Sequence, residues 1–184
     1  MKIYEFDSAD NQAYLHATDD VIDQCRPEPP RPIGMEWSPP TCEIVGRDEF
    51  RSFLPKTDFP KLIIATAVLS ARAVERLRPA LDSCGEILPI YLSNDRDVVY
   101  LFNVTRIINS VDMKRSQFQR FPSGRIAKCE HLVFDPDMIP DDALFFKNTQ
   151  MGPVTEIYAT EAAVTLVKNA RLTGYEFRPV WTND

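Results

Sequence analysis

Two stretches of the chain, ninety residues apart, share one pattern of hydrophobic and polar positions. In the first, apolar residues recur with a 3.6-residue period over 70–81, and a β-branched and aromatic run, EILPIY, follows at 86–91. In the second, the same period covers 160–170 and the run EFRPVW follows at 176–181. Each stretch predicts an amphipathic helix followed by a strand. Without a gap, the matching pairs are Ser70 and Thr160, Ala73 and Ala163, Val74 and Val164, Leu77 and Val167, Ala80 and Ala170, Glu86 and Glu176, Pro89 and Pro179, and Tyr91 and Trp181.

Single residues in these stretches predict where the helices begin and end. Ser70 and Thr160 are N-cap types, whose side-chain oxygen accepts from the first free N–H groups of a helix. Gly174 suits the left-handed residue that follows a helix end, and Pro79 should kink the first helix or end it early. Both strands carry a proline, which cannot donate to a strand ladder. We therefore expect both strands at a sheet edge or with that position turned outward.

Two helix–strand units are too few for a solenoid, which needs about three or more repeats. They favour an α+β fold with internal pseudo-symmetry, unless chance and common helix–strand patterns produce the match. We therefore predict a single α+β domain over 1–184 with a mixed or antiparallel sheet, divided into an N-terminal arm over 1–60 and a core over 61–184. Further predicted elements are strands at 2–6, 41–45, 62–68 and 98–104, one or two helical turns at 48–54, and a hairpin around the turn at 122–124.

The N-terminal arm, residues 1–60, differs from the core in its proline content. Eight of the 15 prolines lie between 27 and 60 (27, 29, 30, 32, 39, 40, 55 and 60). Proline fixes φ and removes a backbone donor, so we predict irregular or polyproline-like chain laid over the core from Asp7 to Pro40. The apolar residues Tyr14, Leu15, Met35 and Trp37 predict that the arm packs and is not disordered.

Charge also separates the arm from the core. Residues 1–60 hold 12 acidic and 6 basic residues, whereas 61–184 hold 15 of each, so the net charge of −6 comes from the arm. We expect no nucleic-acid partner, because that affinity comes mainly from neutralising phosphates, although the basic segment 113–128 with two phenylalanines could contact RNA. An acidic face can instead attract a basic protein over a long range. The other reading is an ordinary solubilising surface.

No short motif for catalysis or cofactor binding occurs. The sequence lacks GxGxxG and GxxxxGK[ST] phosphate loops, the GxSxG nucleophile turn and the HExxH zinc motif. Its four cysteines form no CxxC pair, which predicts reduced, mostly buried thiols. Cys129 and His131 are two apart in a predicted strand, so they could share a face as a Cys–His pair or be a buried thiol beside an exposed imidazole. We expect no catalytic residue, no metal and no cofactor.

The distribution of apolar residues also bears on location. No apolar run approaches the roughly 20 residues that span a bilayer. The first ten residues, MKIYEFDSAD, lack the apolar centre of an export signal. We expect a cytoplasmic protein without a membrane partner.

Segments from 62 onward resemble the eleventh immunity-protein family of bacterial polymorphic toxin systems, long catalogued as a domain of unknown function. The most specific segments are NVTRIINSVDMKRS at 103–116 and LTGYEFRPVW at 172–181. VLSARAVERL, EILPIYL and HLVFDPDMIPDDALFFK also fit, so the resemblance covers about two thirds of the chain, and KIYEF at 2–6 is a further match.

The resemblance implies a cytoplasmic inhibitor that binds a toxin delivered by neighbouring cells, with no catalytic residues of its own. If that toxin is a nuclease, an acidic patch could imitate the phosphate backbone in its basic groove. The alternative is a small-molecule sensor or enzyme with a pocket between the two helix–strand units, where Glu86 and Glu176 would be candidates unless they are solvent-facing acids at strand starts. The predicted partner-binding residues are Asp19, Asp20, Asp23, Glu28, Asp135, Asp137, Asp141 and Asp142.

Overall fold

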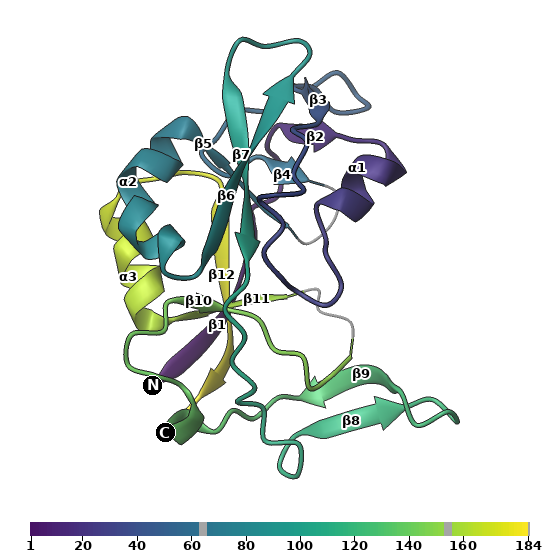
Figure 1. Cartoon of the computed structure of the whole chain (residues 1–184), viewed down its shortest axis with the longest axis vertical. Coiled ribbons are helices and arrows are strands. Elements are labelled where there is room, and N and C mark those ends of the chain that lie inside the picture. The colour runs from purple at the N-terminus through teal and green to yellow at the C-terminus, as the bar shows by residue number, and fades with distance from the viewer. Residues whose placement is uncertain (63–65, 153–155, 184) are drawn as a thin grey trace.

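The computed structural model describes residues 1–62, 66–152 and 156–183. These residues form the predicted α+β fold, in which the two larger sheets lie one above the other along the long axis of the molecule, with helices beside them (Figure 1). The predicted strand at 62–68 lies partly outside the described residues. Within the described residues, no helix is both long enough and apolar enough to cross a membrane.

The first sheet has four strands, all antiparallel to their neighbours. The N-terminal strand β1 lies inside this sheet, between β11 and β12, so the first residues of the N-terminal arm are structurally part of the core. The order across the sheet is β10 (Phe145–Phe146), β11 (Ile157–Thr160), β1 (Lys2–Ser8) and β12 (Tyr175–Thr182).

The second sheet has six strands and is mixed, because β2 is parallel to β4 and β3 is parallel to β6. β6 and β7 form the predicted hairpin around the polar turn at 93–97. The order across the sheet is β4 (Lys61–Leu62), β2 (Tyr14–His16), β3 (Thr41–Val45), β6 (Gly85–Leu92), β7 (Val98–Val104) and β5 (Ala67–Ser70).

The two helix–strand units have the same local topology. One contains β5, α2 (Ala71–Asp82) and β6, and the other contains β11, α3 (Glu161–Asn169) and β12. In each unit an antiparallel strand separates the two strands that flank the helix, namely β7 in the first and β1 in the second. The registers also correspond: Ser70 is opposite Val99 as Thr160 is opposite Ile3, and Pro89 is opposite Tyr100 as Pro179 is opposite Tyr4. The internal repeat remains an interpretation of this correspondence.

The helix starts differ between the units. Ser70 caps α2 as predicted, since its Oγ accepts from the Ala73 N–H at 3.1 Å. Thr160 is at the N-cap position of α3, as predicted, but its hydroxyl donates to the Ala143 carbonyl at 2.7 Å. The expected side-chain capping hydrogen bond is therefore absent from the second unit, where a tertiary hydrogen bond replaces it.

Two predictions about helix ends also need correction. Pro79 does not end α2, which continues to Asp82; the proline is exposed, so the carbonyl that lacks its hydrogen bond can bind water. The left-handed residue after α3 is Arg171, with φ 50°, and not Gly174. Gly174, with φ 86°, lies in the turn before β12, where a Cβ would collide with the side chains of Thr57 and Gln12.

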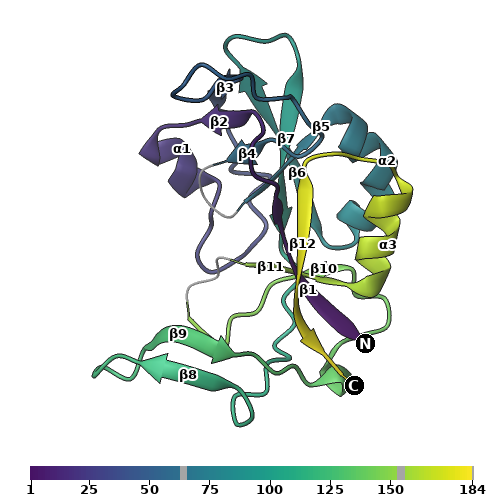
Figure 2. The same ribbon diagram turned by 180° about the vertical axis from the view of Figure 1, so that it is seen from behind.

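α2 and α3 lie side by side against both sheets, on the left in Figure 1 and on the right in Figure 2. Their inner faces share one hydrophobic core, in which Leu77 of α2 and Val167 of α3 are fully buried. Phe102 of β7 and Phe145 of β10 meet edge to face in the same core, with ring centroids 5.6 Å apart. The core thus joins the two units and the two sheets.

Residues 31–37 of the N-terminal arm lie against β6. The Glu86 carboxylate accepts from the backbone N–H groups of Ile33 and Gly34 at 2.7 and 3.0 Å. The Trp37 indole N–H donates to the Pro89 carbonyl at 2.9 Å. Among the described residues, β6 pairs with β3 only at its last two positions, so this segment covers an otherwise open strand edge. Glu86 is therefore half-buried and structural, and the expectation that it faces solvent is wrong.

Two other parts of the arm differ from expectation. A short helix, α1 (Asp19–Gln24), and β2 form where irregular chain was predicted. The predicted helical turns at 48–54 are absent: the segment is a loop closed by a bridge between Arg47 and Phe53. Inside this loop the Asp48 carboxylate accepts from the Ser52 N–H at 2.7 Å, which favours a turn over a helix.

The predicted hairpin around residues 122–124 is confirmed. It consists of β8 (Gln117–Arg120) and β9 (Ile126–His131) and projects sideways from the body at the lower end of the molecule in both views (Figures 1 and 2). A 3₁₀ turn, η1 (Pro136–Met138), follows it in the chain.

Candidate functional site

The first group of predicted partner-binding acids lies on and after α1. Asp19, Asp20 and Asp23 are exposed, and α1 carries no basic residue in its last turn. Val21 on the inner side of the helix packs against a cluster of buried apolar residues that includes Leu15 and Ile90. Glu28 is also exposed, in the segment that follows. The outer side of α1 is therefore an acidic surface.

The second group surrounds η1, where part of its charge serves the loop itself. Asp135 caps η1 by accepting from the Asp137 N–H at 3.1 Å. Asp142 pairs with Arg106 at 2.7 Å, and this hydrogen bond lowers the pKa of the Asp142 carboxyl. Asp137 and Asp141 are exposed. The two groups do not form one surface, because α1 and the loop that carries η1, beside the C-terminus, lie at opposite ends in both views (Figures 1 and 2).

The structure adds exposed apolar side chains that sequence reasoning missed. Met35, Phe50 and Phe53 are exposed by 104%, 81% and 75%, the highest values among the large apolar residues described. Met35 was predicted to pack and does not. All three belong to the N-terminal arm, which also carries the net charge. In DEFRSFL, Phe50, Phe53 and Leu54 have the i, i+3, i+4 spacing of a helix, which is why the sequence predicted helical turns and not an exposed loop.

The loop over 46–54 presents its two phenylalanines on a defined backbone. The Leu54 N–H donates to the Gly46 carbonyl at 2.9 Å, and the Asp48 N–H donates to the Ser52 carbonyl at 3.1 Å. Arg51 adopts a left-handed conformation at the tip, with φ 63°. Because these bonds close the loop without burying Phe50 or Phe53, both rings remain available to another molecule.

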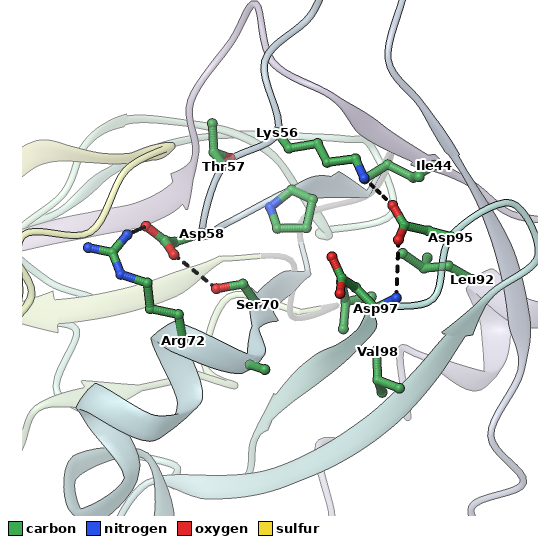
Figure 3. Close-up of a pocket in the computed structure, with 13 residues that line it drawn as sticks. Ile44, Lys56, Thr57, Asp58, Ser70, Arg72, Leu92, Asp95, Asp97 and Val98 are labelled. Atoms are coloured by element: carbon green, nitrogen blue, oxygen red, sulfur yellow. Dashed lines mark hydrogen bonds and ion pairs between the residues drawn. The ribbon is translucent and has the colours of Figure 1, made fainter.

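A cleft of about 330 Å³ lies between the N-terminus of α2 and the β6–β7 hairpin (Figure 3). Its buried end is organised by Asp58. One carboxylate oxygen accepts from the Ser70 hydroxyl at 3.0 Å, and the other accepts from Arg72 and from the Thr173 N–H, both at 2.9 Å. Asp58 therefore joins the start of α2 to the turn before β12.

The open end of this cleft carries a second ion pair and an additional carboxylate. Lys56 pairs with Asp95, and this hydrogen bond lowers the pKa of the Asp95 carboxyl. Asp97 lies between this pair and the Asp58–Ser70 pair (Figure 3), and its carboxylate has no ion pair within the described part of the chain. The cleft thus has more acid than base and suits a lysine or arginine side chain.

The serine that lines the cleft makes structural hydrogen bonds. A serine nucleophile needs a base to take its proton. The Ser70 hydroxyl instead donates to Asp58 and accepts from the Ala73 N–H, and the described lining contains no histidine. These contacts commit Ser70 to the helix cap.

The pocket of the alternative function would lie between the two helix–strand units. A groove of about 430 Å³ runs between α2 and α3, and it is lined mainly by apolar side chains such as Leu77, Leu144 and Leu166. Arg76 is its one charged lining residue among those described. Glu86 and Glu176 do not line this groove. Glu86 holds the arm, and Glu176 is exposed on β12.

The four cysteines are free thiols. Cys25, Cys42 and Cys84 are buried and unpaired, as predicted, and burial raises the pKa of the Cys25 thiol to about 12. Burial also raises the pKa of the half-buried Cys129 thiol, which opposes a role as a nucleophile. The strand register shifts between Gln117 and Phe118, so Cys129 and His131 do not follow simple alternation along β9. Among the described residues, no three histidine, cysteine or acidic side chains are grouped so as to hold a metal ion.

No protein-family model matches this sequence, and a search of curated proteins returned no match. The resemblance to the eleventh immunity-protein family therefore remains a prediction.

Proposed function

We propose that this chain is an immunity protein, which binds a cognate antibacterial toxin in the cytoplasm and neutralises it by occluding its active site. One observation carries the proposal: the N-terminal arm combines the whole charge excess with the three most exposed large apolar side chains described. Aromatic anchors within a polar, charged rim are the usual composition of a protein–protein interface.

The contact surface that we propose consists of Asp19, Asp20, Asp23, Phe50 and Phe53, and we call it the acidic–aromatic surface. α1 carries the three acids, and the loop with both phenylalanines continues from β3. α1 and β3 lie on the same side of the molecule in both views (Figures 1 and 2). One partner domain could therefore contact both parts.

The charge of this surface favours a basic partner. If the toxin is a nuclease, its substrate groove would be basic, and the α1 carboxylates could occupy phosphate positions there. Such complementarity accelerates association and makes it sensitive to salt. The cleft beside Asp97 could accept one basic side chain of the same partner. The alternative, a small-molecule sensor or enzyme, has less support because the groove between the two units gathers few polar groups.

Affinity capture from a lysate of the producing cells tests the proposal. Three baits are compared: the unmodified chain, the variant D19K/D20K/D23K, and the variant D137K/D141K as a control that reverses two charges at the other end of the molecule. We expect the unmodified chain and the control to retain one stoichiometric partner with a basic, toxin-like domain. The α1 variant should retain it at least about tenfold less well at low salt. Equal retention by all three baits would refute the acidic–aromatic surface, and capture of no such partner would count against immunity.

A further inference from the structure

A separate cavity of about 520 Å³ lies where the base of the β8–β9 hairpin meets the ends of β1 and β12. Three cationic or imidazole side chains line it, Lys2, Arg115 and His131, and they come from three separate segments of the chain. The described lining residues include no carboxylate. The rest of the lining is Val133, Pro179, Val180, Trp181 and Thr182.

The backbone around the cavity is well ordered by hydrogen bonds. Lys2 is paired with Thr182 in the first sheet, and His131 is paired with Gln117 in the hairpin. Arg115 follows a tight turn in which the Asp112 carboxylate accepts from its N–H at 3.0 Å. The three side chains are therefore carried by segments that do not need to fold around a ligand.

These three side chains are free of partners in the part of the chain that the structure describes. Among the described residues, the Lys2 ammonium, the Arg115 guanidinium and the His131 imidazole make no hydrogen bond or ion pair. The two carboxylates beside them serve backbone groups: Asp112 accepts from the turn, and Glu161 accepts from the Lys2 N–H at 3.0 Å. The described lining of the cavity therefore offers the side-chain donors of Lys2, Arg115 and His131 and no carboxylate acceptor.

One wall of the cavity is aromatic. Trp181 is half-buried, and its indole packs against Phe134 with ring centroids 6.0 Å apart. Val180 and Pro179 extend this apolar side of the cavity. A half-buried indole that lines a cavity is a side chain on which a flat ligand can stack.

We propose that this cavity binds an organic anion in which a sugar links a phosphate group to a flat heteroaromatic ring, as in a mononucleotide. The volume lies within the range of small-molecule sites. Arginine and lysine are the usual ligands of phosphate, and the indole would hold the ring. The cavity shares no residue with the acidic–aromatic surface, so this inference is independent of the proposed toxin partner. The ring could belong to a free nucleotide or to the end of a single strand of nucleic acid.

Tryptophan fluorescence provides the test. The chain has two tryptophans, so the substitution Trp37→Phe leaves Trp181 as the sole indole. This variant is titrated with adenosine 5′-monophosphate, adenosine, inorganic phosphate and a 5′-phosphorylated deoxyadenosine decamer. We expect saturable quenching by the monophosphate, with binding at least about tenfold weaker for adenosine or phosphate alone. The thermal shift of the unmodified chain with the same ligands provides a second readout if Trp37→Phe does not fold.

Matched charge variants decide whether the cavity is responsible. Arg115→Gln should weaken binding of the monophosphate about tenfold or more. Arg125→Gln removes the same charge at the hairpin turn, outside the cavity, and should leave that binding unchanged. If the decamer binds more tightly than the monophosphate and Arg125→Gln weakens only the decamer, the ligand is a strand end. Equal loss in both variants, equal binding of inorganic phosphate, or no saturable binding by either readout would overturn the proposal.

Discussion

Glu86 and Glu176 occupy matching positions in the two units but have different surroundings. The Glu86 carboxylate accepts from Ile33, Gly34 and the Asn103 side-chain amide, whereas Glu176 is exposed. The sequence pairs the two residues, but it cannot show which strand edge the arm covers, because that contact joins residues about fifty positions apart. Identical residue types at matching positions of the two units can thus have unrelated roles.

This difference gives a prediction with an internal control. Glu86→Ala removes three accepted hydrogen bonds, and we expect the free energy of unfolding in urea to fall by about 2 kcal/mol. Glu176→Ala should change it by less than about 0.5 kcal/mol, because the side chain is a surface carboxylate. Limited proteolysis should also become faster at residues 25–40 in the first variant only. Equal effects of the two substitutions would refute the anchoring role of Glu86.

At the scale of elements, local signals predicted most of the fold. The helix periods, the Ser70 cap and the hairpins all depend on residues close in sequence, and the structure confirms them. Predictions failed where distant groups intervene: the Ala143 carbonyl takes the Thr160 hydroxyl away from the cap of α3. The short α1 and β2 were missed because three to six residues carry too little periodicity to detect.

The shared core predicts that the two units unfold together. Leu77→Ala in α2 and Val167→Ala in α3 remove fully buried groups from the same cluster. We expect losses of about 2–4 and 1–3 kcal/mol in the free energy of unfolding, respectively. Far-UV circular dichroism and tryptophan fluorescence should continue to report one coincident unfolding transition in both variants. Separate transitions in either variant would show that the units are independent.

At the scale of the whole molecule, the surface has regions of opposite character. The acidic α1 lies at one end, and the hairpin with the cationic cavity lies at the other (Figures 1 and 2). The sequence showed that the arm is acidic and that residues 113–128 are basic. It could not bring Lys2, Arg115 and Trp181 into one cavity, because the fold joins the first strand, a central turn and the last strand there.

The two groups of predicted acids also show that the sequence does not predict where distant segments lie in the fold. Their composition and exposure follow from the sequence, but their positions at opposite ends of the molecule do not. Asp142 also pairs with Arg106, a contact between residues separated by 36 positions. We therefore favour the α1 group as the partner contact, since it lies on the same side of the molecule as β3, the strand that leads to Phe50 and Phe53 (Figures 1 and 2).

A growth-protection assay tests the central claim most directly. The toxin-like domain identified by capture is expressed from an inducible promoter in a sensitive bacterium, with the unmodified chain, with D19K/D20K/D23K or with D137K/D141K. We predict that the unmodified chain and D137K/D141K restore growth and that D19K/D20K/D23K does so poorly at equal protein levels. If the captured domain stops growth while the unmodified chain is bound to it, the chain is a partner of that domain but not its immunity protein.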